Sequence, residues 1–220
     1  MLNLSYPLLK AASLAASKDR TRYYLNGVYV EKRGNELRYV ATDGHMAFIA
    51  SQEMPPVHHY VEDFDFIISN GGLKRAFAGC TKKTWFLECE LDIPVLPVKQ
   101  ISLNGVSLKL DHNYSDGLID GIFPNWRAML NNVSLRDEKL SNFDPALVGR
   151  LADIAKALDV DTKSVRMHQN GQDAAVVGFG RSDAMAVLMP LRVGKNDVRL
   201  TEHDMKMITG VKLERETAAA

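Results

Sequence analysis

The stretch RYYLNGVYVEKRGNELRYVATDGHMAFIA, residues 22–50, carries the densest local structural signals in the chain. Two runs rich in aromatic and β-branched residues, YYLNGVYVEK and ELRYVAT, flank a tight turn at Arg33-Gly34-Asn35. A second turn, Thr42-Asp43-Gly44-His45, leads into the apolar run MAFIA. Turns of this kind between such runs are typical of adjacent antiparallel strands. The stretch therefore predicts a short meander that ends in a polar corner.

The composition is that of an ordinary globular protein, with 46% hydrophobic and 25% charged residues among 220. Lysine and arginine total 27 and so do aspartate and glutamate, so any nucleic-acid binding has to come from a local surface. Two cysteines, Cys80 and Cys89, are too few for a disulfide framework and lack partners at metal-site spacing. Lys10 interrupts the apolar N-terminus, and no run is long enough to cross a bilayer. We therefore expect a soluble cytoplasmic protein.

The order strand, helix, strands occurs twice before residue 111. We expect a first strand at Leu2–Leu4 and a helix over Ser5–Ser17, with Ser5 as a cap and Pro7 in its first turn. The run FDFIIS then predicts a strand and LKRAFAG a short helix. The runs TWFLECEL, VKQISL and VSLKL follow as strands, the last two joined by an Asn104-Gly105 hairpin turn. Residues 2–52 and 64–110 are thus two units of the same build, although we find no residue identity between them.

A third unit begins at Asp144, after a loop at residues 114–121 and an aromatic-proline corner at Phe123-Pro124-Asn125-Trp126-Arg127. Asp144 is a strong helix cap, Pro145 takes the first helical position, and apolar residues recur at helical spacing as far as Leu158. The runs SVRMHQ, AAVVGFG and AMAVLMPLRV predict three strands. The polar sequence after Gly194 is an extension in which Thr201 caps a short helix.

Catalytic signals are weak. Asp43 and His45 share a turn but have no activated nucleophile beside them, and the turn itself explains an Asp-Gly pair. His58 and His59 are adjacent, which is not the spacing of a metal site. The sequence has neither a phosphate-binding loop nor a dinucleotide fingerprint. We therefore expect no enzyme activity, no metal and no cofactor.

Three separated motifs resemble one family. The stretch from Arg22 to Ala47 is similar to the start of the middle domain of the bacterial DNA polymerase III beta subunit, the sliding clamp. Phe123–Arg127 resembles the corner that closes that domain, and Val187–Val193 resembles the family's Val-Met-Pro-Met-Arg-Leu ending. The resemblance implies an α+β processivity fold of β-α-β-β-β units, with the helices on one face of antiparallel sheets.

The resemblance also implies a domain organisation. Residues 1–127 correspond to the middle domain, and residues 128–193 to the second half of the C-terminal domain. Residues 194–220 form an extension of unknown role. The family's first domain has no counterpart, and this reduced size suggests a phage- or plasmid-borne homologue.

The family binds partner peptides where its middle domain meets the C-terminal strand. The matching positions in this chain are Leu25, Thr42, Gly44, His45, Met46, Ala47, Pro124, Ala128, Met129, Val187, Met189, Pro190 and Leu191. Met46, Ala47 and Ala128 replace basic and leucine residues that are usual in the family. The expected partner, a DNA polymerase or another protein with a clamp-binding motif, would therefore present a more apolar peptide.

The family's helices surround double-stranded DNA without reading its sequence. The cations expected to face phosphates are Lys10, Lys18, Arg20, Lys74, Arg75, Arg150 and Lys156. By resemblance the chain forms a homo-oligomeric ring through edge strands, with trimer and tetramer both open. The alternative is a non-encircling adaptor or decoy that binds clamp-binding proteins. Neither requires a membrane.

Overall fold

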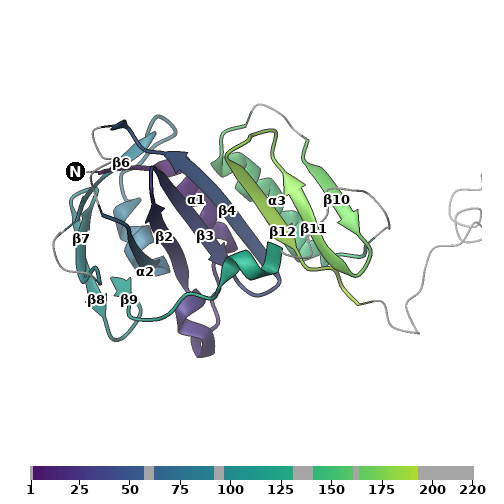
Figure 1. Ribbon diagram of the computed structural model, residues 1–220, viewed down its shortest axis with the longest axis horizontal. Helices are drawn as coiled ribbons and strands as arrows, with labels where there is room; N and C mark the ends of the chain where they lie inside the picture. Colours follow the sequence, from purple (N-terminus) through teal and green to yellow (C-terminus); the bar gives the residue numbers. More distant parts are fainter. Residues whose placement is uncertain (1, 57–61, 92–96, 131–140, 161–163, 193–220) are drawn as a thin grey trace, which may run out of the picture.

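The computed structural model describes residues 2–56, 62–91, 97–130, 141–160 and 164–192 and has an α+β fold (Figure 1). The helices are α1 Tyr6–Ala15, α2 Asn70–Ala76 and α3 Pro145–Ala157, with 3-10 turns η1 Arg20–Leu25 and η3 Trp126–Leu130. The strands are β1 Leu2–Ser5, β2 Gly27–Arg33, β3 Glu36–Thr42, β4 Met46–Glu53, β5 Phe64–Ser69, β6 Phe86–Leu91, β7 Gln100–Leu103, β8 Val106–Asp111, β9 Leu118–Ile119, β10 Arg166–Asn170, β11 Asp173–Gly178 and β12 Ala184–Leu188. They form one twelve-stranded sheet in the order β1-β6-β7-β8-β9-β5-β2-β3-β4-β12-β11-β10.

The predicted meander is confirmed as β2, β3 and β4, which pair antiparallel in sequence order. Its first strand begins at Gly27, because Tyr23, Tyr24 and Leu25 of the predicted run lie in η1. Gly34 takes a positive φ of 58° in the turn after β2, a conformation that favours glycine. The second turn brings Thr42 opposite Ala47 and so starts β4 directly after the polar corner. The predicted hairpin at Asn104-Gly105 is also present, where it joins β7 to β8.

The first two units interlock by exchanging strand partners. The strand β1, from the first unit, pairs with β6 of the second, and β5 of the second unit pairs with β2 of the first. The predicted order of strand, helix and strands is therefore present in both. The segment expected as a loop at residues 114–121 contains the short strand β9, which is parallel to β8. That expectation was wrong because Leu118 and Ile119 are buried and complete the sheet between β8 and β5.

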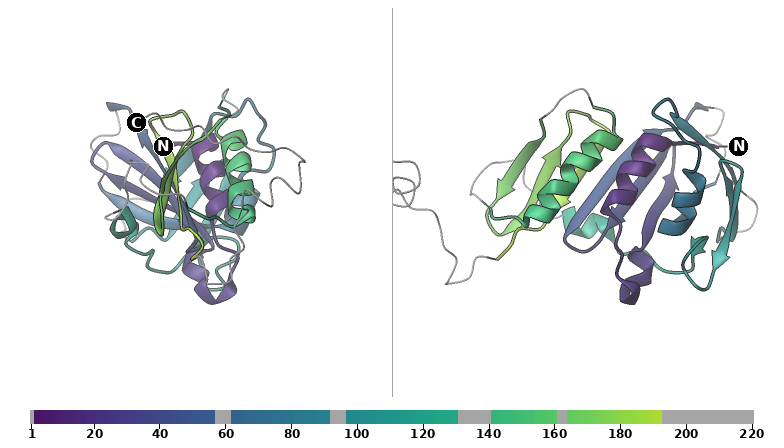
Figure 2. Two further views of the ribbon diagram at one scale, coloured as in Figure 1. Left: turned by 90° about the vertical axis from the view of Figure 1, so that its right-hand side faces the viewer. Right: turned by 180° about the vertical axis from the view of Figure 1, so that it is seen from behind.

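The helices lie on one face of the sheet, as expected. The right-hand view of Figure 2 shows α3, α1 and α2 side by side in front of the strands, and α1 packs directly against α3. On α3 the buried residues Leu147, Leu151 and Ile154 recur at helical spacing and face this contact and the sheet. On α1 the apolar face includes Leu8 and Leu9, both fully buried.

One expected helix-capping bond and one expected strand end were wrong. Ser5 occupies the N-cap position of α1, but its side chain makes no capping hydrogen bond. It is also the last residue of β1, and its backbone N–H donates to the side chains of Tyr39 and Gln52. The strand β12 ends at Leu188, short of the predicted residue 193. Pro190 has no N–H to donate to a sheet, which explains the early end. The predicted cap at Thr201 lies outside the described residues.

Tyr39 ties the edge strand β1 to the middle of the sheet. The buried hydroxyl of Tyr39 accepts a hydrogen bond from the Ser5 backbone N–H at 3.0 Å. It also donates to Gln52 Oε1 at 2.5 Å, and Gln52 in turn donates to the Asn3 carbonyl. Because β1 is an end strand in the sheet order, these contacts join one end of the sheet to β3 and β4 near its middle.

We expect Tyr39→Phe to lower the free energy of unfolding by roughly 1–2 kcal/mol, because the Ser5 N–H and Gln52 Oε1 would each lose a hydrogen bond to the hydroxyl. Urea denaturation should show a lower midpoint with an unchanged m-value. Hydrogen exchange should accelerate at β1 before it does at β2 or β3. Equal exchange rates at β1 in both proteins would contradict this role for the hydroxyl.

Candidate functional site

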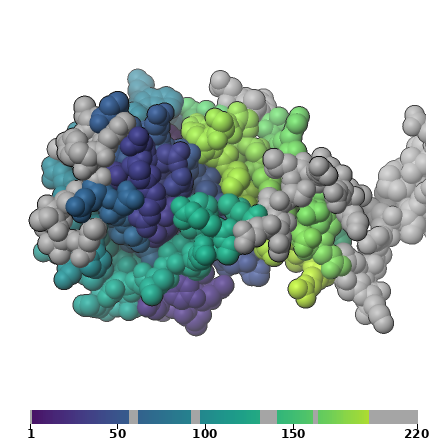
Figure 3. Space-filling model, viewed as in Figure 1, coloured from purple at the N-terminus to yellow at the C-terminus, as the bar shows by residue number. Residues whose placement is uncertain are grey.

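A cavity of about 440 Å³ opens at the junction of β4 and β12. Figure 3 shows the segment that contains η3 on the surface between the first-unit strands and β12. The lining residues are Arg22, Tyr24, Leu25, Thr42, Gly44, His45, Met46, Ala47, Phe123, Pro124, Asn125, Trp126, Met129, Val187 and Met189. They come from η1, the corner before β4, the segment around η3, and the end of β12.

Most of the expected pocket residues meet at this cavity. Ten line it: Leu25, Thr42, Gly44, His45, Met46, Ala47, Pro124, Met129, Val187 and Met189. Ala128, Pro190 and Leu191 do not. Ala128 is exposed on η3. Leu191 instead donates its backbone N–H to the Asn142 carbonyl at 2.7 Å, which directs the chain away from the cavity after Met189.

Five further lining residues were not predicted: Arg22, Tyr24, Phe123, Asn125 and Trp126. Three of them belong to the aromatic-proline corner, where only Pro124 was selected. Trp126 could have been predicted from Met129, because the two residues are three apart in η3 and residues three apart lie on the same side of a 3-10 turn.

The corner between β3 and β4 is fixed by its own side chains. Thr42 Oγ1 donates to the Met46 carbonyl at 2.7 Å and accepts from the Gly44 N–H at 3.0 Å. The Asp43 carboxylate accepts from the N–H groups of His45 and Met46, both at 2.8 Å. Gly44 has a φ of 93°, and a Cβ there would lie 2.7 Å from Arg22 Nη1. Asp43 therefore shapes the turn, and His45 is left exposed at the cavity.

Arg150 of α3 forms an ion pair with this corner, at 2.5 Å between Nη2 and Asp43 Oδ2. Partial burial raises the pKa of Asp43, but the hydrogen bonds from Met46 and His45 and the Arg150 guanidinium outweigh it, so the pKa is lower than usual. Arg150 was expected to face phosphate. Its guanidinium contacts the polar corner and so links the third unit to it, and the expected contact with phosphate stays a prediction.

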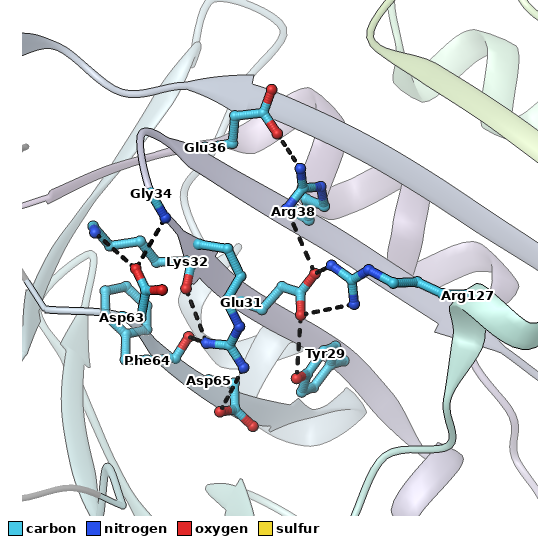
Figure 4. A network of polar contacts seen from close by, with 11 residues as sticks. Tyr29, Glu31, Lys32, Gly34, Glu36, Arg38, Asp63, Phe64, Asp65 and Arg127 are labelled. Carbon is cyan, nitrogen blue, oxygen red and sulfur yellow. Dashed lines mark hydrogen bonds and ion pairs between the residues drawn. The ribbon is translucent and has the colours of Figure 1, made fainter.

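The opposite wall of the cavity is anchored to β2, as Figure 4 shows. The Arg127 guanidinium stacks 4.1 Å from the Trp126 ring and forms an ion pair with Glu31, whose side chain is 1% exposed. Phe123 stacks on Tyr29 with ring centroids 4.8 Å apart. The wall thus depends on one buried carboxylate and two aromatic contacts.

The cavity is suited to apolar side chains of a short peptide. Met189 is 46% exposed at its rim, and its backbone N–H donates to the His45 carbonyl at 2.8 Å. Methionine adapts its shape to different partners. A concave, largely apolar site with a few polar groups is typical of ligand recognition. Among the described residues no group of three or more potential ligands could hold a metal ion.

The other expected cations occupy two places. Lys10, Lys74, Arg75 and Lys156 are exposed on the three helices that lie together in Figure 2. Lys18 and Arg20 line a separate cavity beside η1.

Two of the helix cations have partners within the chain. Lys10 donates to the Tyr6 hydroxyl at 3.1 Å, and Arg75 donates to the Asp116 carbonyl. In the part of the chain that the structure describes, no helix is long and apolar enough to span a membrane.

We expect Arg150→Met to lower stability at pH 7 by about 1 kcal/mol, because the ion pair is partly exposed. The folded-state pKa of Asp43 lies below its unfolded value, so the pair contributes fully above about pH 4 and is lost as the pH falls through the folded pKa. The difference from wild type should therefore shrink in acid. Lys156→Met on the same helix is the control, and a pH-independent difference would contradict the assignment.

Comparisons with known proteins give one family. Residues 5–77 match the family model of the DNA polymerase III beta subunit, central domain. The beta sliding clamp of Escherichia coli strain K12 is 30% identical over 125 residues, which make up 56% of this chain and 30% of that protein. The beta sliding clamp of Rickettsia bellii is 23% identical over 185 residues, or 82% of this chain and 46% of that protein. The chain therefore spans less than half the length of these curated relatives.

Solved structures agree with this similarity over most of the chain. A DNA polymerase sliding clamp from Pseudomonas aeruginosa superposes with a TM-score of 0.64 at 20% identity, covering 87% of this chain and 67% of that one. The DNA polymerase III beta subunit from Thermotoga maritima gives a TM-score of 0.62 at 15% identity, covering 87% and 65%. Residues 5–77 thus resemble the central domain of the DNA polymerase III beta subunit, and the chain as described has the fold of the bacterial sliding clamps.

Proposed function

We propose that this protein is a sliding-clamp-like processivity factor without enzyme activity. In this proposal it encloses double-stranded DNA as part of a homo-oligomeric ring and tethers a polymerase or another protein through a peptide bound between β4 and β12. The observation that carries the proposal is the cavity at that junction, because ten of its lining residues are those assigned to the peptide pocket by family resemblance.

The construction of the cavity supports peptide binding. Thr42 and Asp43 already satisfy the backbone N–H groups of the polar corner, so few of these donors are left for a ligand. Recognition would then depend on apolar side chains inserted beside Met46, Val187 and Met189. The assignment of the peptide-binding residues and the domain boundary after residue 127 belong to the same proposal.

The helix face supports loose contact with DNA. Its cations sit on α1, α2 and α3, which lie on the same side of the sheet (Figure 2). The chain has no net charge, so such contacts would be weak, salt-sensitive and independent of base sequence. A protein of this kind would act in the cytoplasm, where the DNA is.

The pocket is tested by a pair of neighbouring substitutions. Met189→Asp places a charge at the rim of the cavity and should weaken binding of a fluorescent clamp-binding peptide at least about tenfold. Leu191→Asp is the matched control, because Leu191 is 52% exposed and does not line the cavity, and its peptide affinity should stay within about twofold. Fluorescence anisotropy gives both affinities. Unchanged affinity in Met189→Asp would remove the pocket from the proposal.

The ring is tested with circular DNA. Protein assembled on a nicked circular duplex should be retained in high salt and lost when the circle is linearised, because a closed ring holds DNA by topology. Light scattering after size-exclusion chromatography should show an oligomer at micromolar protein. A strict monomer that is retained equally on circular and linear DNA would instead identify a non-encircling adaptor.

A further inference from the structure

A second cavity, of about 390 Å³, lies on the helix side of the molecule. Its lining residues are Tyr6, Pro7, Lys10, Cys80, Thr81, Lys82, Thr84, Trp85, Lys156, Ala157 and Asp159. They come from the first turns of α1, the loop between α2 and β6, and the end of α3. The cavity shares no residue with the one at the β4–β12 junction.

The loop that forms one side of this cavity is held in place by hydrogen bonds. The N–H of Thr84 donates to the Thr81 carbonyl, and the N–H of Thr81 donates to Thr84 Oγ1, both at 3.0 Å. The Trp85 carbonyl accepts from the N–H of Tyr6 at 2.9 Å, which fixes the loop to the start of α1. The residues that line the cavity are therefore positioned by the fold.

The charge of the cavity favours an anion. Three lysines, Lys10, Lys82 and Lys156, line it against one carboxylate, Asp159. All three lysines are exposed, so their ammonium groups can reach a ligand at modest desolvation cost. Phosphate groups of a nucleic-acid backbone are the anions that such lysines commonly bind.

An exposed aromatic ring completes the site. The Trp85 side chain is 57% exposed although tryptophan is usually well buried, and it lines this basic cavity. Bases of single strands stack on such rings, while neighbouring cations hold the backbone. A base inside a duplex is already stacked on both faces and cannot do so without being extruded.

We propose that this cavity binds a nucleotide unit of single-stranded DNA, with its base on Trp85 and its phosphate among Lys10, Lys82 and Lys156. The inference rests on the proposed function for the source of the strand, and it adds a site that distinguishes single from double strands on the helix face. Such a site would engage unpaired template next to a primed duplex.

The test uses the full chain and a fluorescein-labelled dT oligonucleotide of about eight residues, a length within the usual site sizes. Anisotropy should report binding, and the oligonucleotide should quench tryptophan emission, because Trp85 is exposed and the other tryptophan, Trp126, is buried. Trp85→Ala should weaken binding roughly five- to a hundredfold. Phe86→Ala is the matched control: Phe86 is equally exposed, at 57%, and does not line the basic cavity. Phe86 lines a neighbouring cavity with Glu36, Glu53 and Asp183, which Trp85 also borders, so only the loss of Trp85 changes the basic cavity.

The lysines have their own comparison. Lys82→Glu should weaken oligonucleotide binding and reduce the slope of log affinity against log salt by about 0.7, the value for one phosphate contact on a single strand. Lys83→Glu makes the same charge change next to the cavity without lining it and should have the smaller effect. Bound oligonucleotide should also slow alkylation of Cys80, which lines the cavity, while Cys89 is fully buried.

Three results would overturn the site. Equal losses in Trp85→Ala and Phe86→Ala would show that stacking in the cavity is not used. A duplex that competes as well as the oligonucleotide would reduce the site to general phosphate attraction. Binding of dTMP as tight as that of the oligonucleotide would identify a free-nucleotide site instead. Retention of Trp85→Ala on circular duplex should match wild type, so failure of the ring and failure of this site give different results.

Discussion

The antiparallel pairing of β4 with β12 is the constraint on which the rest of the site depends. It sets Ala47 opposite Val187 and Met46 opposite Leu188, so the corner before β4 lies beside the end of β12. The β12 side of the cavity depends on that register, because a shift by one residue would turn Val187 to the other face of the sheet. The same pairing makes the sheet continuous from the first units to the third.

Two ion pairs support the walls of the cavity, and the burial of their side chains decides how much each contributes to stability. Asp43 and Arg150 are 19% and 29% exposed, so water screens their attraction and the pair mainly orients α3. Glu31 is 1% exposed, and a buried carboxylate left without partners costs about 3–5 kcal/mol. Arg38 also approaches Glu31, at 3.8 Å, but Arg127 is closer and carries the pocket wall. The wall next to η3 is therefore the more sensitive of the two.

Local chemistry explains what could be predicted from the sequence. The meander, the helix cap at Asp144 and the polar corner depend on residues within a few positions of one another, and all are present. The resemblance to the clamp family then predicted that segments far apart in the sequence line one pocket. The ion pair of Arg150 was not predicted because its partner, Asp43, lies 107 residues away in the chain. Leu191 was included because nothing local to it shows that the chain turns toward Asn142 after Met189.

Electrical neutrality limits how the proposed clamp could hold DNA. With 27 basic and 27 acidic residues, the chain has no long-range field to attract a polyanion, and salt at about 0.1 M screens separated charges beyond about 10 Å. Lys10, Lys74 and Lys156 would attract phosphates only when the helix face already lies next to the DNA. Affinity alone would then be weak, and persistence on DNA would have to come from enclosure. In the proposed ring, a neutral chain with a few exposed cations on its helix face would meet that requirement, because it would neither trap DNA by charge nor prevent the DNA from sliding.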